Sequence, residues 1–393
     1  MDKIRYLLLF LLLCINSIYV YGAVLPRIIV VLLLVILSIF TKRKAFYSIQ
    51  PIVLITLCFA VSFMIGFVNN SELALGESKN LVFLYMYMLI MTYIWNQKTV
   101  FDLIFVTSIL VNIAITGMAI LFFMGFDLDR PYLPESNFVL QGERFGYSLT
   151  TLQSLSFFLA FNLIYFFNKR NMISLIPCVL GIINVFINDR RGLILFPAMV
   201  FVLYVLFVYK GKWKKDFLIY VPIVVLLLFG VLTYLTNLSG IDLGEQFSKA
   251  FGLVEYDSDS DGVRIQQFKA LMDKFMESPI LGNGIGSYAE RCIRNDEFLY
   301  AYELTYVGYL MKFGLLGFLL IFGTYAAMIL RLYRKNKEDL QFHAVLGGTI
   351  SLLLINITNP YVNVSLLIFL TIVFVWNQKS TVVRRRSTPS YVS

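Results

Sequence analysis

Long apolar segments recur along almost the entire chain, and they constrain the fold more than any other feature. Runs long enough to cross a hydrocarbon core about 30 Å thick occupy most of the 393 residues. A water-soluble protein could not bury this much apolar surface, because hydrophobic residues make up 59% of the chain and the mean hydropathy is +0.77. The sequence therefore predicts an all-α polytopic membrane protein.

The apolar runs predict about twelve transmembrane helices, and residues 1–393 are expected to form a single integral membrane domain. The first run follows basic residues, as in a signal sequence, but it is long and another run follows at once, so we expect an uncleaved helix. The predicted spans lie near 4–21, 24–40, 51–68, 80–95, 102–124, 148–167, 172–188, 192–209, 217–236, 304–330, 342–358 and 360–376.

The basic residues predict the orientation of these helices. The side that holds both termini carries 20 of the 33 Lys and Arg residues but only 5 of the 24 Asp and Glu residues. Short cytoplasmic loops are enriched in Lys and Arg, so both termini are expected in the cytoplasm, with the basic residues 384–393 as a cytoplasmic tail. The basic residues are scattered over short loops, which favours contact with anionic membrane lipid and argues against nucleic acid as a partner.

Two loops on the opposite, outer side are long enough to carry a site. The first, about 125–147, contains Arg130 and Arg144 among aromatic residues, prolines and carboxylates. It is either a surface loop folded over the helix ends or a lid and part of a polar substrate groove. The second, about 237–303, is the larger and is expected to contain short helices.

The second loop carries a predicted helix followed by a turn. An apolar stripe recurs at helical spacing and predicts an amphipathic helix that lies on the membrane surface or packs on the ends of spans. Pro279 ends this helix, and Gly282, Gly284 and Gly286 predict a tight turn. A second reading of the turn is a cradle of N–H groups near a lipid-linked phosphate. The stripe consists of Phe268, Leu271, Met272, Phe275 and Met276.

Several charges lie where charge is costly. Arg190 and Arg191 stand in a short outer connection between two spans, close to the bilayer core, where arginine is expensive unless it is paired or useful. They either pair with Asp189 or grip phosphate with their planar guanidinium groups. Glu303 stands at the mouth of the span 304–330, where it complements the helix dipole or serves as a general base. Lys312, deeper in the same span, must face a cavity or a partner.

Three tyrosines accompany Glu303. Tyr302, Tyr306 and Tyr309 recur at helical spacing and are expected to share one face. They either pack against neighbouring helices or form a platform for sugar rings. The one histidine, His343, lies at the cytoplasmic start of a span, which excludes histidine-based metal sites and Ser–His triads on the outer face.

With these features the chain resembles the O-antigen ligase and O-antigen polymerase superfamily of bacterial envelope proteins. The resemblance rests on the span number, on the large late outer loop and on three degenerate motifs. Arg191-Gly192 is similar to the family's Ser-Arg-Gly element, and Arg264 followed by Phe268 and the segment 279–286 is similar to its "R…W…PlfGxGxg" block. The segment 303–317 is similar to "HNxYLqlxxexGxxG", with Glu303 in place of the histidine of the ligases.

The resemblance implies a metal-independent, inverting glycosyltransferase of the bacterial inner membrane that needs no cofactor. Its implied partners are an oligosaccharide linked to undecaprenyl diphosphate, membrane lipid and a chain-length regulator. Arg191 and Arg264 would hold the diphosphate with help from Arg190, and Glu303 would take the proton from the acceptor hydroxyl. Tyr302, Tyr306, Arg130 and Arg144 would contact the substrate, and no metal site is expected.

The acidic residue at position 303 favours a repeat-unit polymerase, which moves a glycan from its carrier to the non-reducing end of another lipid-linked repeat unit. Two alternatives remain. An O-antigen ligase would deliver the glycan to lipid A–core. A transporter or flippase for the same lipid-linked sugar would line a central cavity with charges deep in several spans.

Overall fold

The computed structural model describes most of the helical part of the chain. The described residues are 2–18, 24–40, 49–91, 93, 95–123, 138–141, 144–147, 149–187, 191–210, 259–293, 299–300, 302–357 and 367–377. The predicted span 217–236, the residues 188–190 with Arg190, most of the loop 125–147 including Arg130, and the tail 384–393 lie outside these ranges.

The described residues are almost entirely helical, which confirms the predicted helical class. Each predicted span except 217–236 overlaps a helix. The helices are α1 (Asp2–Ile18), α2 (Val24–Ile39), α3 (Ile49–Asn69), α4 (Ser71–Met91), α5 (Gln97–Phe123), α6 (Leu149–Lys169), α7 (Met172–Ile187), α8 (Arg191–Leu203), η1 (Tyr204–Val208), α11 (Asp259–Glu277), α12 (Thr305–Lys335), α13 (Leu340–Ile355), α14 (Leu367–Ile372) and η2 (Val373–Asn377).

A short hairpin is the one addition to the helical fold within the described residues. β1 (Phe138–Gln141) pairs antiparallel with β2 (Arg144–Tyr147), with Phe138 opposite Tyr147 and Gln141 opposite Arg144. It lies in the first predicted outer loop and was not predicted from the sequence.

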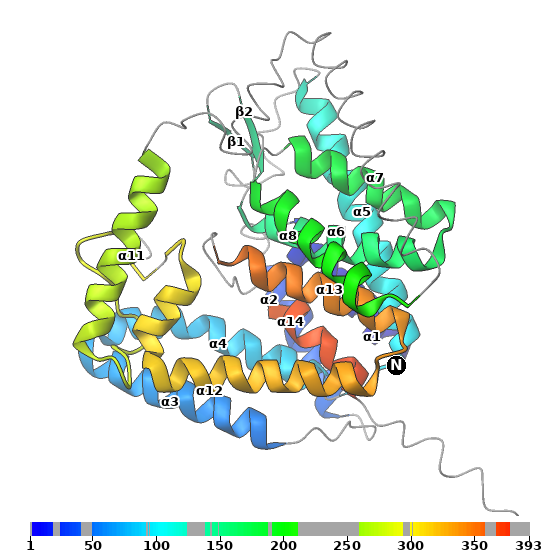
Figure 1. Ribbon diagram of the computed structural model, residues 1–393. Coiled ribbons are helices and arrows are strands. Elements are labelled where there is room, and N and C mark those ends of the chain that lie inside the picture. Colours follow the sequence, from blue (N-terminus) through cyan, green and yellow to red (C-terminus); the bar gives the residue numbers. More distant parts are fainter. Residues whose placement is uncertain are drawn as a thin grey trace, which may run out of the picture.

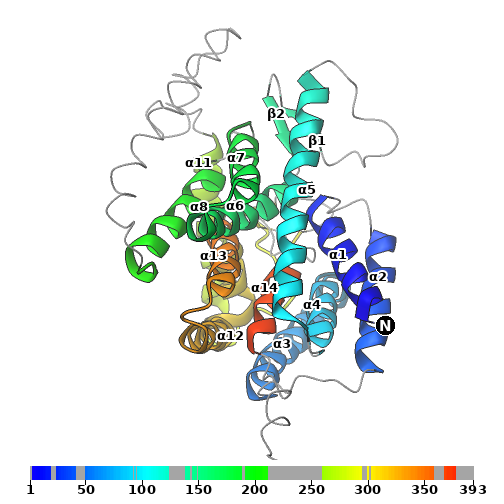
Figure 2. The ribbon, with the colours of Figure 1, turned by 90° about the vertical axis from the view of Figure 1, so that its right-hand side faces the viewer.

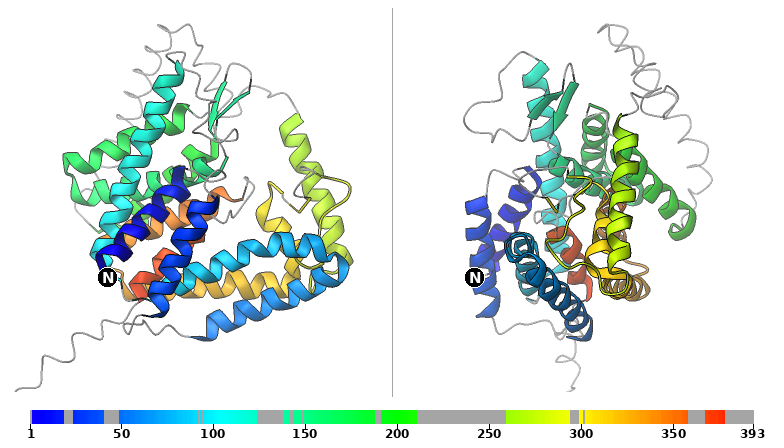
Figure 3. Two further views of the ribbon diagram at one scale, coloured as in Figure 1. Left: turned by 180° about the vertical axis from the view of Figure 1, so that it is seen from behind. Right: turned by 90° about the vertical axis from the view of Figure 1, so that its left-hand side faces the viewer.

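The described helices form two groups, which lie one above the other in the view of Figure 1 and from behind in Figure 3. In one group α6 and α13 pack along each other, and α5, α7 and α8 pack around α6. In the other group α12 runs beside α3, while α11 packs on α12. Helices α1 and α2 flank the bundle on the side where α5 runs along its length (Figure 2).

The contact between α6 and α13 is the centre of the first group. Phe157, Phe158 and Phe161 of α6 are fully buried and join the main hydrophobic cluster. The Oγ atoms of Ser156 and Ser351 lie 2.7 Å apart and form a hydrogen bond between the two helices. Such a bond satisfies polar groups that would be costly to leave unpaired in an apolar interior.

The outer faces of the helices are apolar as well. Among the described residues, Gln97–Leu121 and Thr305–Lys335 are long and apolar enough to cross a membrane. Several other helices expose large apolar side chains away from the bundle, such as Leu25, Ile29 and Met64, which are 67%, 49% and 67% exposed. Helices that are apolar all round are typical of a protein that sits in lipid.

Candidate functional site

Arg264 and Glu303, to which the resemblance gives separate roles, are in contact in the structure. Arg264 lies on α11, and Glu303 precedes the first residue of α12, Thr305. The Nε atom of Arg264 donates to Oε2 of Glu303 at 3.2 Å. Their side chains are 38% and 24% exposed, so the pair is partly buried but remains open to the surroundings. A guanidinium and a carboxylate from separate segments therefore lie together, partly exposed, beside the N-terminal end of α12.

The segment around Glu303 is held by hydrogen bonds on its C-terminal side. The N–H of Leu304 donates to Oε1 of Gln267 on α11 at 3.1 Å, and Gln267 is only 1% exposed. The N–H of Thr305 donates to the carbonyl of Glu303 at 3.0 Å. The carboxylate thus lies just before the N-terminus of α12, where the helix dipole favours negative charge.

Helix α11 is amphipathic, as predicted, and it packs on α12, but its apolar stripe is not buried as a whole. Leu271 is fully buried and Gln267 and Ala270 are nearly so, whereas Phe268 and Met276 are 48% and 69% exposed. The buried face is centred on the side that meets α12 and the residues before it. The polar Gln267 lies inside because it bonds the backbone there, a role that apolar periodicity cannot reveal.

The three tyrosines do not share one face, because α12 begins at Thr305 and Tyr302 lies before it. Tyr302 is buried among Leu271, Ala289 and Met311, and its hydroxyl accepts a hydrogen bond from the N–H of Ala289. Burial raises the pKa of Tyr302 to about 12, since its phenolate would lose its hydration.

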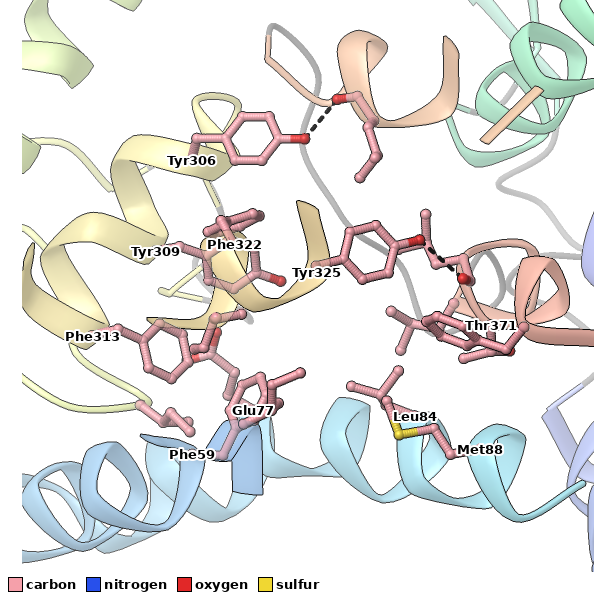
Figure 4. A pocket seen from close by; sticks show the side chains of 17 residues that line it. Phe59, Glu77, Leu84, Met88, Tyr306, Tyr309, Phe313, Phe322, Tyr325 and Thr371 are labelled. Atoms are coloured by element: carbon pink, nitrogen blue, oxygen red, sulfur yellow. Dashed lines mark hydrogen bonds between the residues drawn. The ribbon is translucent and has the colours of Figure 1, made fainter. Parts of the chain in front are cut away.

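Tyr306 and Tyr309 instead line an apolar cavity of about 140 Å³ (Figure 4). The Tyr306 hydroxyl donates to the carbonyl of Leu353 at 2.7 Å, and that of Tyr325 donates to the carbonyl of Leu370 at 2.9 Å. The cavity lies among α3, α4, α12, α13 and α14. It is aromatic and aliphatic except for Glu77 and Thr371 on its wall.

The segment 279–286, here called the glycine turn, is a tight turn, as predicted. Gly282, Gly284 and Gly286 have φ angles of 80°, 90° and 87°, a region that residues with a Cβ rarely adopt. A Cβ on Gly284 would lie 2.2 Å from the backbone N of Gly66 in α3. Glycine is needed here for the backbone conformation and for close approach to other backbones.

The hydrogen bonds of the glycine turn do not favour its second reading as a phosphate cradle. The N–H groups of Asn283 and Gly284 donate to the carbonyls of Met311 and Lys312, at 2.9 and 3.0 Å. The N–H of Ile285 donates to the carbonyl of Ser62 at 3.0 Å. Because these donors already have partners inside the protein, the turn acts as a structural joint.

The glycine turn fits into a break in α12. Gly314 interrupts the helix with φ 65° and ψ 178°. The N–H of Leu315 donates to the carbonyl of Pro279 at 2.8 Å, and the N–H of Leu316 donates to the carbonyl of Ile280 at 3.2 Å. The turn thus supplies partners for backbone groups that the break would leave unpaired.

Lys312 was predicted to face a cavity or a partner, and the structure shows a partner. The sequence did not identify which residue it is. Nζ of Lys312 lies 2.6 Å from Oε1 of Glu77 on α4, and the two side chains are 5% and 14% exposed. Glu77 was missed because the span was placed at 80–95, whereas α4 begins at Ser71. The sequence offered two signals for this pair, a lysine within one predicted span and a carboxylate just before another.

For the other predicted arginines of the site, the structure gives at most the position along the backbone. Arg191 is the first residue of α8, and Arg144 is the first residue of β2. Arg190 and Arg130 lie outside the described residues. Their roles therefore stay predictions.

The family comparison covers the region in which this site lies. Residues 176–322 match the model of a family described as O-antigen ligase. None of the curated proteins compared with the chain matches it. The matched stretch contains Arg190, Arg191, Arg264, Glu303 and the glycine turn. The match covers less than half of the chain and shows that this stretch is similar to the O-antigen ligase family.

Proposed function

We propose that the protein is an O-antigen polymerase of the bacterial inner membrane. It transfers a glycan from undecaprenyl diphosphate to the non-reducing end of another lipid-linked repeat unit at the periplasmic face. About twelve spans hold the site, and both termini are cytoplasmic. Arg130, Arg144 and Tyr306 contact the substrate, and a chain-length regulator acts with the enzyme. The predicted substrate contact of Tyr302 is dropped, because Tyr302 is 4% exposed and its hydroxyl is bonded to the Ala289 N–H.

The observation that carries this proposal is the Arg264–Glu303 pair. A carboxylate and a guanidinium 3.2 Å apart offer the two functions that the reaction needs. The carboxylate accepts the proton of the attacking hydroxyl, and the guanidinium stabilises the charge that grows on the departing diphosphate. Arg191 and Arg190 complete the diphosphate site, so that fixed cations act without a metal.

The pair also suggests how the free enzyme keeps both groups ready. In the free enzyme Arg264 and Glu303 neutralise one another. A bound diphosphate carries more negative charge than one carboxylate and draws the guanidinium toward itself. Glu303 is then released to act on the acceptor hydroxyl, and single displacement inverts the anomeric carbon.

The decisive experiment is polymerisation of purified lipid-linked repeat units by the purified protein. Glu303→Gln keeps the size of the side chain but removes the base, and it should lower the rate about 1,000-fold. Glu290→Gln is the matched control, because Glu290 is an exposed carboxylate in the same loop. Wild-type polymer from Glu303→Gln would remove Glu303 from the mechanism, and purified wild-type protein that makes no polymer would favour a transporter.

The ligase is the second candidate, and the description of the matched family favours it. A deletion strain separates the two reactions. Loss of a polymerase leaves lipid A–core carrying a single repeat unit. Loss of a ligase leaves bare core, with polymer still on the carrier lipid.

A further inference from the structure

The ion pair between Glu77 and Lys312 is nearly inaccessible and includes neither of the proposed reacting groups. It is formed by residues 235 positions apart, at an Nζ–Oε1 distance of 2.6 Å. Ionised side chains in an apolar bundle are costly, and those that occur are paired and mostly functional. Mutual charge neutralisation does not explain why Glu77 and Lys312 are present, because two apolar residues could fill the same space without any charge.

The carboxylate end of the pair holds the segment that follows α11. Oε2 of Glu77 accepts the N–H of Gly286 at 2.7 Å, while Oε1 faces Lys312. The glycine turn follows α11 directly, and α11 carries Arg264. Glu77 therefore fixes one end of the element that positions the guanidinium.

The ammonium end of the pair holds the segment that precedes α12. Nζ of Lys312 donates to the carbonyl of Tyr300 at 2.9 Å and lies 5.5 Å from the centre of the Tyr300 ring. Tyr300 stands three residues before Glu303. On the other side of Glu303, Leu304 is held by Gln267. The carboxylate is thus fixed from both directions along the chain.

We propose that Glu77 and Lys312 are positioning residues, which hold the Arg264 and Glu303 segments in register through Gly286 and Tyr300. The inference rests on the proposed function, because it assigns the pair to the same reaction. Neither residue touches the reacting atoms, and both act through the groups that they hold. Figure 4 shows Glu77 at the wall of the apolar cavity beside α12.

The first test separates positioning from binding. Glu77→Gln removes the charge and leaves Gln with a single carbonyl oxygen to serve Gly286 and Lys312. A small displacement of reacting groups costs about 100-fold in rate, so kcat should fall by about that factor while KM for the lipid-linked donor changes by less than about threefold. The matched control is Glu277→Gln, which breaks an exposed pair of the same 2.6 Å length on α11. Wild-type kcat in Glu77→Gln would overturn the proposal.

The second test separates positioning from charge balance. Exchanging the two residues, as Glu77→Lys with Lys312→Glu, keeps opposite charges in contact. It turns an ammonium toward the N–H of Gly286 and a carboxylate toward the carbonyl of Tyr300, so both links are lost. The exchanged variant should be as slow as Glu77→Gln, whereas Lys312→Arg, which keeps the donors, should recover to within about tenfold of the wild type. Full activity in the exchanged variant would show that only charge balance matters.

The third test does not depend on activity. Backbone amide exchange reports local opening. In Glu77→Gln the amide of Gly286 and the amides of 302–304 should exchange faster than in the wild type, while α13 stays protected. Unchanged exchange would overturn the proposal even if the protein were inactive. If the purified wild type makes no polymer, the proposed function fails, and this measurement still decides whether the pair holds the two segments.

Discussion

Glycines allow close packing in two regions, the α6–α13 contact and the glycine turn. The two regions differ in the kind of atom that lies closest to the glycine. A Cβ on Gly347 of α13 would lie 2.2 Å from Cδ1 of Ile164, the tip of a flexible side chain. A Cβ on Gly284 would lie 2.2 Å from the backbone N of Gly66, in a residue whose φ is already 90°. At Gly347 the approaching atom belongs to a side chain that can move, although a Cβ on the neighbouring Gly348 would also lie 2.9 Å from the carbonyl oxygen of Phe157. At Gly284 backbone meets backbone and neither can move aside, which fits the proposal that this region fixes the distance between Arg264 and Glu303.

The largest effect that this comparison predicts is for Gly284→Ala. The strained φ and the overlap with α3 should together destabilise the protein by about 4 kcal/mol or more. The measurement is thermal unfolding in detergent, together with polymer formation. Gly323→Ala is the control, because a Cβ there meets nothing within 4 Å. An unfolding temperature for Gly284→Ala equal to that of the control would refute a backbone-packed turn.

A smaller effect is predicted for Gly347→Ala in the α6–α13 contact. Overpacking should cost about 2 kcal/mol, since Ile164 can move away. The double variant Gly347→Ala with Ile164→Val removes the Cδ1 atom that the new methyl meets, and it should regain more than half of the lost stability. If the double variant is no more stable than Gly347→Ala alone, the backbone of α6 and not its side chains limits this contact.

The smallest effect is predicted for Tyr302→Phe, which removes the acceptor of the Ala289 N–H. The loss should be about 1 kcal/mol at neutral pH. In the folded wild type the pKa of Tyr302 is raised to about 12 from an ordinary value of 10.0. The unfolded chain therefore loses this proton first as the pH rises, and the wild type loses stability between about pH 10 and 12 while the Phe variant loses less. Denaturant unfolding of both proteins across this range should show their difference narrowing and then reversing; a constant difference would contradict the assigned environment.

The sequence predicted where helices lie better than it predicted which residues meet. Apolar length is a local property, and the observed helices follow it closely. That Lys312 needs a partner follows from its place within an apolar span. That the partner is Glu77 depends on how α4 and α12 pack, which the sequence does not show. For α11 the amphipathic helix was predicted, but the apolar period could not show that Gln267 is buried to bond the backbone and that Phe268 is exposed.

The candidate site was predicted in part for a different reason. Arg264 and Glu303 were paired in the mechanism because a family resemblance linked two short motifs, and the structure brings their side chains into contact. Nothing in the spacing of 39 residues could predict that contact. The joint made by the glycine turn and the break at Gly314 was not predicted, since a tight turn by itself does not reveal which helix it fits.

The way in which the glycine turn obtains its partners has a consequence for biosynthesis. The turn takes acceptors from Ser62 and Glu77, which are made early, and from Met311 and Lys312, which are made after it. The turn cannot close until the ribosome has released α12 and that helix has found α3 and α4. A nascent chain that stops short of α12 already carries Arg264, Glu303 and the Gln267–Leu304 partners, but it lacks the carbonyls of Met311 and Lys312 that anchor the glycine turn. The glycine turn is therefore anchored late in synthesis, when the incoming helix α12 supplies the carbonyls of Met311 and Lys312.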